Sequence, residues 1–355
     1  MSLIMILSTV LTALALARPS AAVLYVNPVD GRDGQAGTET EPLKSLAEAL
    51  KRVEPGGTIR LADGVYREEL TTRRAGLPQA VITIEPAAGA RAVFDGESGK
   101  QNALRIVHSY YIVRGLEIRA MDEGIRLEGV TGVVVENNHI HHINNECVRL
   151  RYTAHDNILR RNVIHDCGLD SNGEGIYVGT APEQRTKNKG RADSSVQNRL
   201  EANEIYNVEE GIDVKEDSSG TAIVGNVIYH SSDPESGAIS IRSDANVVLN
   251  NVVFDNRGAG IRVGGDTAPH PQQAGSYLYG VRNVLHGNTA LKNDYADYKF
   301  MRAPQQADCT NLASGLGTHG SYYFGSDIED FLSCPPDLPE PYARYVAWHR
   351  SQVDN

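Results

Sequence analysis

The sequence predicts an all-β fold, a single-stranded right-handed parallel β-helix with an N-terminal capping helix. The first observation is a repeat of roughly 21 to 36 residues that runs from 103 to 288. The second is that each repeat holds two short strands of alternating polarity and a turn, with no helical segment between the strands. The third is size, because a unit this short cannot bury a face alone and must stack on its neighbours. Right-handed winding follows from the general preference for right-handed crossovers.

The N-terminal residues predict a targeting segment followed by a cap. Residues 1–22 form an apolar run that ends in Ser20-Ala21-Ala22, so we expect a signal peptide and a secreted or periplasmic protein. An uncleaved membrane anchor is the alternative, although the run is short for a span. The stretch 25–68 then contains a strand, a polar loop, an amphipathic helix near 43–53 and another strand. We expect this helix to cover the open end of the solenoid.

The chain is thus divided into a signal peptide (1–22), a β-helix with its N-terminal cap (23–290) and an irregular C-terminal cap or tail (291–355), where the repeat is lost. Four cysteines suit an oxidising compartment. Cys309 and Cys334 bracket the tail and are expected to pair there. Cys147 and Cys167 either pair with each other or remain buried thiols.

Composition narrows the class of partner. The chain has 355 residues, of which 41% are apolar and 22% charged, which suits one large domain or two small ones with an ample core. Its formal net charge of −11 argues against nonspecific nucleic-acid binding. To bind a polyanion, a protein of this charge would need a local basic groove or a bound cation. We expect a monomer that binds no nucleic acid and, after signal cleavage, no membrane.

Alignment of the repeats produces two columns of side chains that stack along the solenoid. The first is predicted to be a ladder of hydrogen-bonded amides at a turn, made by Asn138, Asn162, Asn203, Asn226, Asn251 and Asn283. The second is predicted to be a stack of flat rings, made by His141, His165, Tyr206, Tyr229, Phe254 and His286. A histidine metal site is the alternative, but Tyr and Phe replace His in the same column, which favours the ring stack.

The first strand of each repeat alternates between core and surface. In the stretch EGIDVK, Ile212 and Val214 are predicted to point inward, so Asp213 and Lys215 point outward. Arg242 has the same outward position as Lys215 one repeat later, which places the two residues about 4.8 Å apart at the backbone. Two adjacent cations either serve a binding groove or are neutralised by acids on a solvated face.

A column of glutamates begins this strand in four repeats, at Glu123, Glu146, Glu174 and Glu210. The first two are expected to pair with arginines three residues later, at Arg126 and Arg149. The last two lie near further acids, and four carboxylates on two neighbouring repeats would suit Ca²⁺ as hard oxygen ligands. The predicted calcium ligands are Glu174, Glu209, Glu210 and Asp213. The alternative is that these acids pair with Lys215 and Arg242.

This combination of charges suits an anionic polysaccharide that contains uronic acids. β-Elimination of a 4-linked uronate removes the proton at C-5, and calcium or arginine can neutralise the adjacent carboxylate. Lys215 is the predicted base and Arg242 its catalytic partner. Ca²⁺ and Arg242 lower the pKa of Lys215 whereas the carboxylates raise it, and the sequence does not decide the balance.

Further residues on or beside the same face are expected to bind substrate. They are Arg151, Tyr177, Arg185, Lys187 and Arg262. Arg185 and Lys187 belong to an insertion, 180–195, which is either a clamp for an extended anion or a solvated loop. Tyr177 is in addition a candidate proton donor to the leaving group, and an ordinary exposed tyrosine is the alternative.

The mature chain resembles the pectin-lyase-like right-handed parallel β-helix superfamily, beginning with YVNPVDGRDGQAG and PGGTIRLADGVY. Around the site it is similar to the alginate lyase and chondroitinase B family, which implies Lys215 as base, Arg242 as its partner and Glu210 as a calcium ligand. The second calcium-binding glutamate of that family is replaced by Val208. The acids Glu174 and EEGID are also similar to family-nine pectate lyases, whose lysine would stand at the place of Ser240.

The predicted function is therefore a calcium-assisted polysaccharide lyase. Three alternatives remain, because the same fold hosts all of them. They are a mannuronan C-5 epimerase-like enzyme, a glycoside hydrolase that uses Asp213 with Glu210 or Asp217, and a noncatalytic carbohydrate-binding β-helix.

Overall fold

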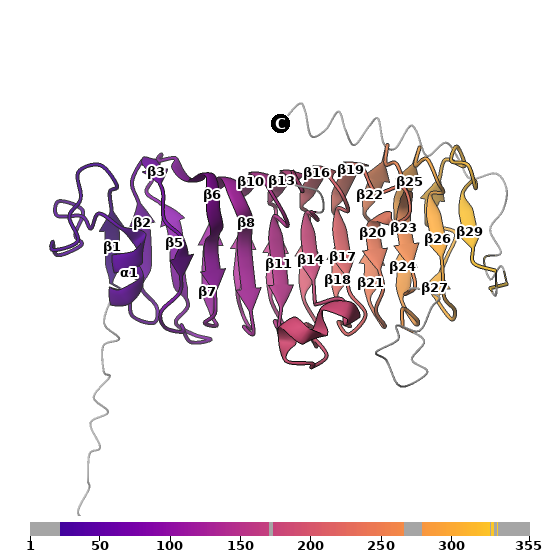
Figure 1. Ribbon diagram of the computed structural model, residues 1–355, viewed down its shortest axis with the longest axis horizontal. Helices are drawn as coiled ribbons and strands as arrows, with labels where there is room; N and C mark the ends of the chain where they lie inside the picture. Colours follow the sequence, from indigo (N-terminus) through magenta and orange to yellow (C-terminus); the bar gives the residue numbers. More distant parts are fainter. Residues whose placement is uncertain (1–21, 170–172, 266–278, 327, 330–331, 333–355) are drawn as a thin grey trace, which may run out of the picture.

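The computed structural model describes residues 22–169, 173–265, 279–326, 328–329 and 332. It is a right-handed parallel β-solenoid, drawn with its axis horizontal in Figure 1. The predicted signal peptide lies outside the described residues, apart from Ala22. The N-terminal helix α1 (Leu46–Arg52) falls within the predicted range and lies at the N-terminal end of the solenoid, beside β1 (Figure 1). Ser45 is the N-cap of this helix, and its hydroxyl accepts a hydrogen bond from the Glu48 N–H at 3.1 Å.

Parallel strands of successive coils form three ladders along the solenoid. The first ladder contains β1 (Val23–Val26), β2 (Thr58–Leu61), β5 (Ile82–Pro86), β7 (Tyr111–Arg114), β9 (Val134–Glu136), β12 (Ile158–Arg160), β15 (Arg199–Glu201), β18 (Ala222–Val224), β21 (Val247–Leu249), β24 (Val284–His286) and β27 (Gln306–Ala307). The second ladder contains β3 (Gly64–Tyr66), β6 (Ala92–Ile106), β8 (Glu117–Glu128), β10 (His139–Ile143), β13 (Val163–Cys167), β16 (Glu204–Val208), β19 (Val227–Ser231), β22 (Val252–Phe254), β25 (Thr289–Leu291) and β28 (Leu312–Ala313).

The third ladder positions the candidate site. It contains β4 (Leu70–Thr71), β11 (Val148–Arg151), β14 (Ile176–Val178), β17 (Ile212–Val214), β20 (Gly237–Ile241), β23 (Ala259–Val263), β26 (Tyr298–Phe300) and β29 (Tyr322–Phe324), and it shares the long strands β6 and β8 with the second ladder. The short 3₁₀ helix η1 (Pro182–Asn188) lies in the insertion between β14 and β15.

Inward-facing aliphatic residues of the third ladder stack coil upon coil in the core. Ile212, Ile239 and Ile261 are in register and each is 0% exposed. Burial of each such side chain is worth about 1.5–3 kcal/mol, so the alternation of apolar and polar residues decides which face of each strand is inward.

The coils continue beyond the predicted boundary at residue 290. Strands β26 and β29 pair in parallel, and their inward rings stack, with centroids 5.4 Å apart for Tyr298 and Tyr322 and 5.5 Å apart for Phe300 and Phe324. The prediction of an irregular segment from residue 291 was therefore wrong up to Phe324, because aromatic residues fill the core there in place of the aliphatic pattern.

The predicted amide ladder is present, with one exchange of members. The Nδ2 group of each residue donates to Oδ1 of the next at 2.8–3.0 Å, in the order Asn138, Asn162, Asn203, Asn226, Asn251, Asn288 and Asn311. Asn283 instead accepts from Asn246 at 2.9 Å and belongs to a second amide column. Assignment of Asn283 to the first column was wrong, because several coils carry asparagines five residues apart, as at 246 and 251 and at 283 and 288.

The predicted ring stack is also present on the second ladder. Successive ring centroids from His141 to His165, Tyr206, Tyr229 and Phe254 are 5.0, 4.6, 4.9 and 5.0 Å apart. His286 does not continue it, since it lies in β24 of the first ladder opposite Leu249. Leu291 takes the position after Phe254.

The three cysteines among the described residues are disulfide-bonded. Cys147 and Cys167 form a disulfide, which decides between the two alternatives left open by the sequence. Cys309 is also disulfide-bonded. Its expected partner, Cys334, lies outside the described residues.

Candidate functional site

One outward-facing column of the third ladder combines cations, an aromatic ring and a buried acid. Strand register places its members in line, in the order Arg126, Arg149, Tyr177, Asp213, Ser240, Arg262 and Lys299. They alternate with the core residues on each strand, so they project from the solenoid as the sequence predicts.

Lys215 and Arg242 follow this column on adjacent coils. The Lys215 N–H donates to the Val178 carbonyl and the Arg242 N–H to the Val214 carbonyl, both at 2.9 Å, so the parallel ladder continues through both residues. Their side chains converge on Asp213, where Lys215 Nζ contacts Oδ2 and Arg242 Nε lies 3.3 Å from Oδ1. The predicted vertical neighbours are therefore neighbours in space, with a carboxylate between them.

The ion pairs set the charge of this group. Burial opposes ionisation of Asp213, which is 0% exposed, but the charges of Lys215 and Arg242 hold its pKa below the ordinary value. Burial also opposes the charge on Lys215, yet the negative charge of Asp213 raises the pKa of this lysine above its ordinary value. The sequence did not decide whether the cations or the carboxylates control the pKa of Lys215. In the structure the effect of Asp213 exceeds that of burial and Arg242, and Lys215 is protonated near neutral pH.

The four glutamates stack as predicted. Backbone hydrogen bonds of 2.9–3.3 Å join Gly124 to Glu146, Cys147 to Glu174 and Gly175 to Glu210. Glu123 pairs with Arg126, and Glu146 Oε1 lies 2.7 Å from Arg149 Nη1, so both predicted pairs form.

Glu174 and Glu210 have a different environment from the first two glutamates. Tyr177 replaces the arginine three residues after Glu174, and burial followed by the negative charges of Asp213, Glu146 and Glu210 raises the pKa of Glu174 to about 8. Burial, then the charge of Asp213, raises the pKa of Glu210 to about 7, although Arg242 Nη2 lies 3.2 Å from Oε1. Two carboxyl groups on adjacent coils can therefore hold or release a proton near neutral pH.

Replacement of Glu174 by glutamine is expected to change the pH dependence of stability. A carboxyl group whose folded-state pKa is raised stabilises the fold below its unfolded pKa, and this stabilisation is lost as pH rises through about 8. Glutamine resembles the protonated acid at every pH. With a chelator present, the variant should match the parent at about pH 5 and exceed its free energy of unfolding by about 2–4 kcal/mol at about pH 8, as measured by urea denaturation. Glu146→Gln, which breaks an ion pair, is the control and should be destabilising at about pH 8; equal pH profiles for Glu174→Gln and the parent would contradict the assignment.

The insertion is tied to the solenoid rather than left as a free clamp. Figure 1 shows it projecting below β14 and β17. Arg185 donates to both carboxylate oxygens of Asp217, at 2.6 and 2.8 Å, and to the Tyr279 hydroxyl at 3.0 Å. Lys187 is exposed. The predicted role of Arg185 in binding substrate is thus not supported, because its guanidinium is already used to hold the insertion.

The other predicted substrate-binding residues, Arg151, Tyr177 and Arg262, lie on the third ladder and differ in their burial and in their intramolecular partners. Tyr177 is 4% exposed, and its ring centroid lies 4.6 Å from Arg149 Cζ and 4.9 Å from Lys215 Nζ. Arg151 Nη2 is 2.6 Å from Glu128 Oε1, so this guanidinium has an intramolecular partner. Arg262 is buried and in register with Ser240 and Lys299.

Comparison with known proteins places this geometry in a family. The family described as "Pel9A-like, right handed beta helix region" matches residues 24–314, well over half of the chain. The chain belongs to this Pel9A-like β-helix family.

Solved structures extend the comparison. An alginate lyase from Paenibacillus sp. str. FPU-7 is 25% identical with a TM-score of 0.67, over 79% of this chain and 95% of that one. Pectate lyase Pel9A is 15% identical with a TM-score of 0.51, over 86% of this chain and 74% of that one, and XylC in complex with xylose is 10% identical with a TM-score of 0.56, over 90% and 88%. At such identities the last two share the fold alone.

A curated relative covers only a short stretch. The uncharacterized protein YwoF of Bacillus subtilis (strain 168) is 33% identical over 79 residues, which are 22% of this chain and 17% of YwoF. The matched stretch therefore spans under a fifth of that relative. Across the described part of this Pel9A-like protein, no helix is long and apolar enough to cross a membrane.

The predicted calcium ligands are only partly available for a cation. Asp213 is ion-paired with two cations, and Glu209 Oε2 accepts a hydrogen bond from the Gly173 N–H at 2.9 Å. In contrast, Glu210 Oε2 is buried without a hydrogen-bond partner among the described residues. Glu210 therefore has one carboxylate oxygen available to a cation and Glu174 lies on the adjacent coil, whereas the carboxylates of Glu209 and Asp213 are already engaged.

Two residues of the column were missed by the sequence analysis as possible contacts for substrate. Arg149 stacks on Tyr177 and donates from Nη2 to Gln184 Oε1 at 3.3 Å, so it joins the column to the insertion. Its position in the repeat could have revealed it. Lys299 donates to the Glu235 carbonyl at 2.6 Å, and it was missed because it lies beyond the predicted end of the solenoid.

Proposed function

We propose that this protein is a polysaccharide lyase that cleaves a uronate-containing polysaccharide by β-elimination. The observation that carries the proposal is the convergence of Lys215 and Arg242, from adjacent coils, on one buried carboxylate. The 25% identity to an alginate lyase over 95% of that chain makes alginate the first polymer to test. The Cys147–Cys167 disulfide supports action outside the cytoplasm.

The proposed roles follow from the charges. Arg242, whose guanidinium stays charged, neutralises the uronate carboxylate and so stabilises the carbanion-like intermediate. Lys215 in its neutral form takes the C-5 proton, and the bond from C-4 to the glycosidic oxygen breaks. Tyr177, whose pKa is raised above the ordinary value by burial and then by nearby carboxylates, keeps its proton and can donate it to the leaving oxygen.

Asp213 controls when Lys215 can act. Because its negative charge raises the pKa of Lys215, only a small fraction of the lysine is neutral near neutral pH. We therefore expect the rate of elimination to increase as pH rises into the alkaline range. Glu174 and Glu210 would hold a Ca²⁺ ion, which when bound would add positive charge to neutralise the substrate carboxylate.

A hydrolytic mechanism based on Asp213 has less support. The Asp213 carboxylate is ion-paired with Lys215 and Arg242, and Asp217 bonds to Arg185 and to Tyr279. A glycosidase needs one free carboxylate and one carboxylic acid on opposite sides of the scissile bond. Neither aspartate is free for that purpose.

The test is a substrate panel of alginate, pectate, chondroitin, dermatan and glucuronan, each with Ca²⁺ or with a chelator. The proposal expects depolymerisation together with an ultraviolet-absorbing unsaturated uronate, first on alginate. Chain shortening without this absorbance would indicate hydrolysis, and altered sugar composition without shortening would indicate epimerisation. Either outcome, or the absence of activity on every polymer, would refute the lyase assignment.

A further inference from the structure

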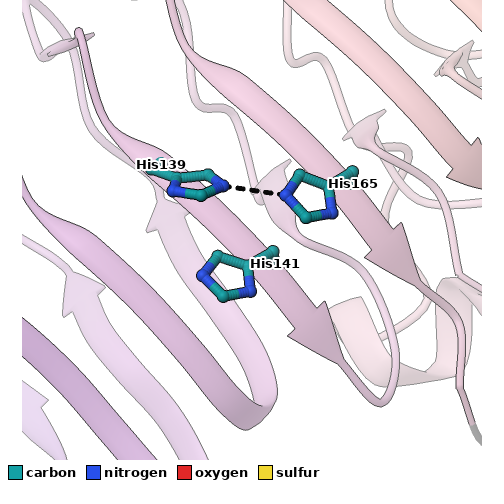
Figure 2. Close-up of side chains that lie close together, drawn as sticks. All are labelled: His139, His141 and His165. Atoms are coloured by element: carbon teal, nitrogen blue, oxygen red, sulfur yellow. Dashed lines mark hydrogen bonds between the residues drawn. The ribbon is translucent and has the colours of Figure 1, made fainter.

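A second cluster of ionisable side chains lies on the outer face of the second ladder. His139 and His141 alternate on β10, so both project to the same side, and His165 on β13 is in register with His141. Figure 2 shows the three rings gathered together. Their centroids are 4.3–5.0 Å apart, and one ligand atom from each ring lies within 4.8 Å of the others.

The ring stack alone does not account for this cluster. His141 and His165 belong to the stack, but His139 does not, and its Nε2 lies only 2.8 Å from Nε2 of His165 (dashed in Figure 2). Tyr206 and Tyr229 continue the stack without nitrogen atoms, so stacking requires only flat rings. In addition, Nε2 of His141 is buried and has no hydrogen-bond partner among the described residues, although Glu117 Oε1 is 3.5 Å away.

A carboxylate behind one ring orients it as in metal sites. Asp166 Oδ2 is 2.7 Å from Nδ1 of His165, and the Asn207 amide donates to Asp166 Oδ1 at 3.2 Å. Because the carboxylate can only accept, Nδ1 of His165 carries the hydrogen, and Nε2 of this ring is the nitrogen that faces His139 and is left to bind a metal. Histidines that bind metals usually donate their other N–H to a carboxylate in this way.

We propose that His139, His141 and His165 bind a transition-metal ion, with Zn²⁺ as the best-fitting ion. Three imidazoles form a known zinc ligand set that leaves a fourth position for water. Exposed His139 also lines a shallow surface pocket with Arg91, Glu117 and Arg161, so an ion can reach the cluster from solvent. The site is on a different ladder from Lys215 and Arg242 and does not depend on the proposed lyase function.

Binding requires a small adjustment. Two nitrogens on one tetrahedral zinc ion are about 3.3 Å apart, given bonds of about 2.0–2.1 Å, so the 2.8 Å separation of the two Nε2 atoms must widen. The exposed His139 side chain can move by this amount. Before His139 Nε2 can bind the ion, its hydrogen must move to Nδ1 of the same ring. This change of tautomer releases no net proton if the three rings are neutral.

The experiment measures Zn²⁺ binding to the full mature protein by competition with a chromophoric chelator, and the visible absorption of bound Co²⁺. The proposal expects one equivalent of Zn²⁺ and a Co²⁺ spectrum typical of tetrahedral nitrogen coordination. His141→Phe and His165→Phe keep a flat ring in the stack, and His139→Ala removes a group outside it. Each should lower affinity at least tenfold, and Asp166→Asn about 10–100-fold.

His155→Ala is the matched control, because His155 Nδ1 also contacts a neighbouring carboxylate, Asp156 Oδ2 at 2.8 Å, on the protein surface. It should leave Zn²⁺ affinity unchanged. A second group, His142, His165 and Asp166, shares one histidine with the proposed site. Loss of binding in His142→Ala but not in His139→Ala, equal loss in His155→Ala, or no stoichiometric binding by the parent would each overturn the proposal.

Discussion

Substitution of Lys215 by methionine is expected to lower the rate of unsaturated-product formation about 10²- to 10⁴-fold, the range that positioned acid–base groups contribute. Methionine retains an unbranched apolar stem but has no group that can accept the C-5 proton. The loss should appear in kcat more than in KM, because Arg242 still binds the substrate carboxylate. The measurement is initial-rate ultraviolet absorbance on the polymer that the panel identifies.

Lys44→Met is the matched control for this substitution. Lys44 is an exposed lysine just before α1, at the N-terminal end of the solenoid and away from the site, so the parent rate should be retained. Circular dichroism of both variants separates loss of chemistry from loss of fold, since removal of Lys215 leaves Asp213 paired with Arg242. A folded Lys215→Met variant within tenfold of the parent rate would exclude Lys215 as the base.

Replacement of Asp213 by asparagine is expected to have the largest effect on stability. The variant keeps the shape of the side chain but leaves Lys215 and Arg242 without their shared counter-charge, and loss of one partner from a buried ion pair costs about 3–5 kcal/mol. Because the folded-state pKa of Asp213 is lowered, its contribution is present above the unfolded pKa and is lost as pH falls through the folded value. Urea denaturation should therefore show the full difference near neutral pH and little difference in strong acid.

The same variant should move the pH–rate profile toward lower pH. Asp213 is the charge that raises the pKa of Lys215, so its removal lets burial and Arg242 lower that pKa and increases the neutral fraction of the lysine. Asp255→Asn, a change at an exposed aspartate, is the control and should alter neither stability nor the profile. An unchanged profile in a folded Asp213→Asn variant would show that another group limits the rate.

The fold could be predicted from sequence because alternation in each strand leaves little choice of inward face. Ile212 and Val214 must be buried, which sends Asp213 and Lys215 outward, and the repeat then aligns Lys215 with Arg242. The same reasoning failed for Asn283 and His286. Both lie one strand away from the predicted columns, because the coil offers asparagines five residues apart and spacing alone does not tell which one enters a given ladder.

The electrostatics of the site could not be predicted to the same extent. Sequence places Asp213 near two cations, but only the side-chain directions show that both contact it and that no arginine among the described residues pairs with Glu174. The proposed zinc site was also hidden from sequence. Tyr and Phe replace His in the repeat column, which favoured a ring stack, and the approach of His139 to His165 depends on the outward course of β10 and β13.

The stacking of outward residues on separate coils has a consequence for how specificity can diverge among related proteins. Each coil contacts mainly the coil before and the coil after it, and the surface positions alternate with those that fill the interior. A substitution at Arg262 or Lys299 therefore alters one end of the surface without disturbing the packing beneath Lys215. If the proposed site binds polysaccharide, its preference among sugars can thus change one coil at a time while Lys215 and Arg242 are retained.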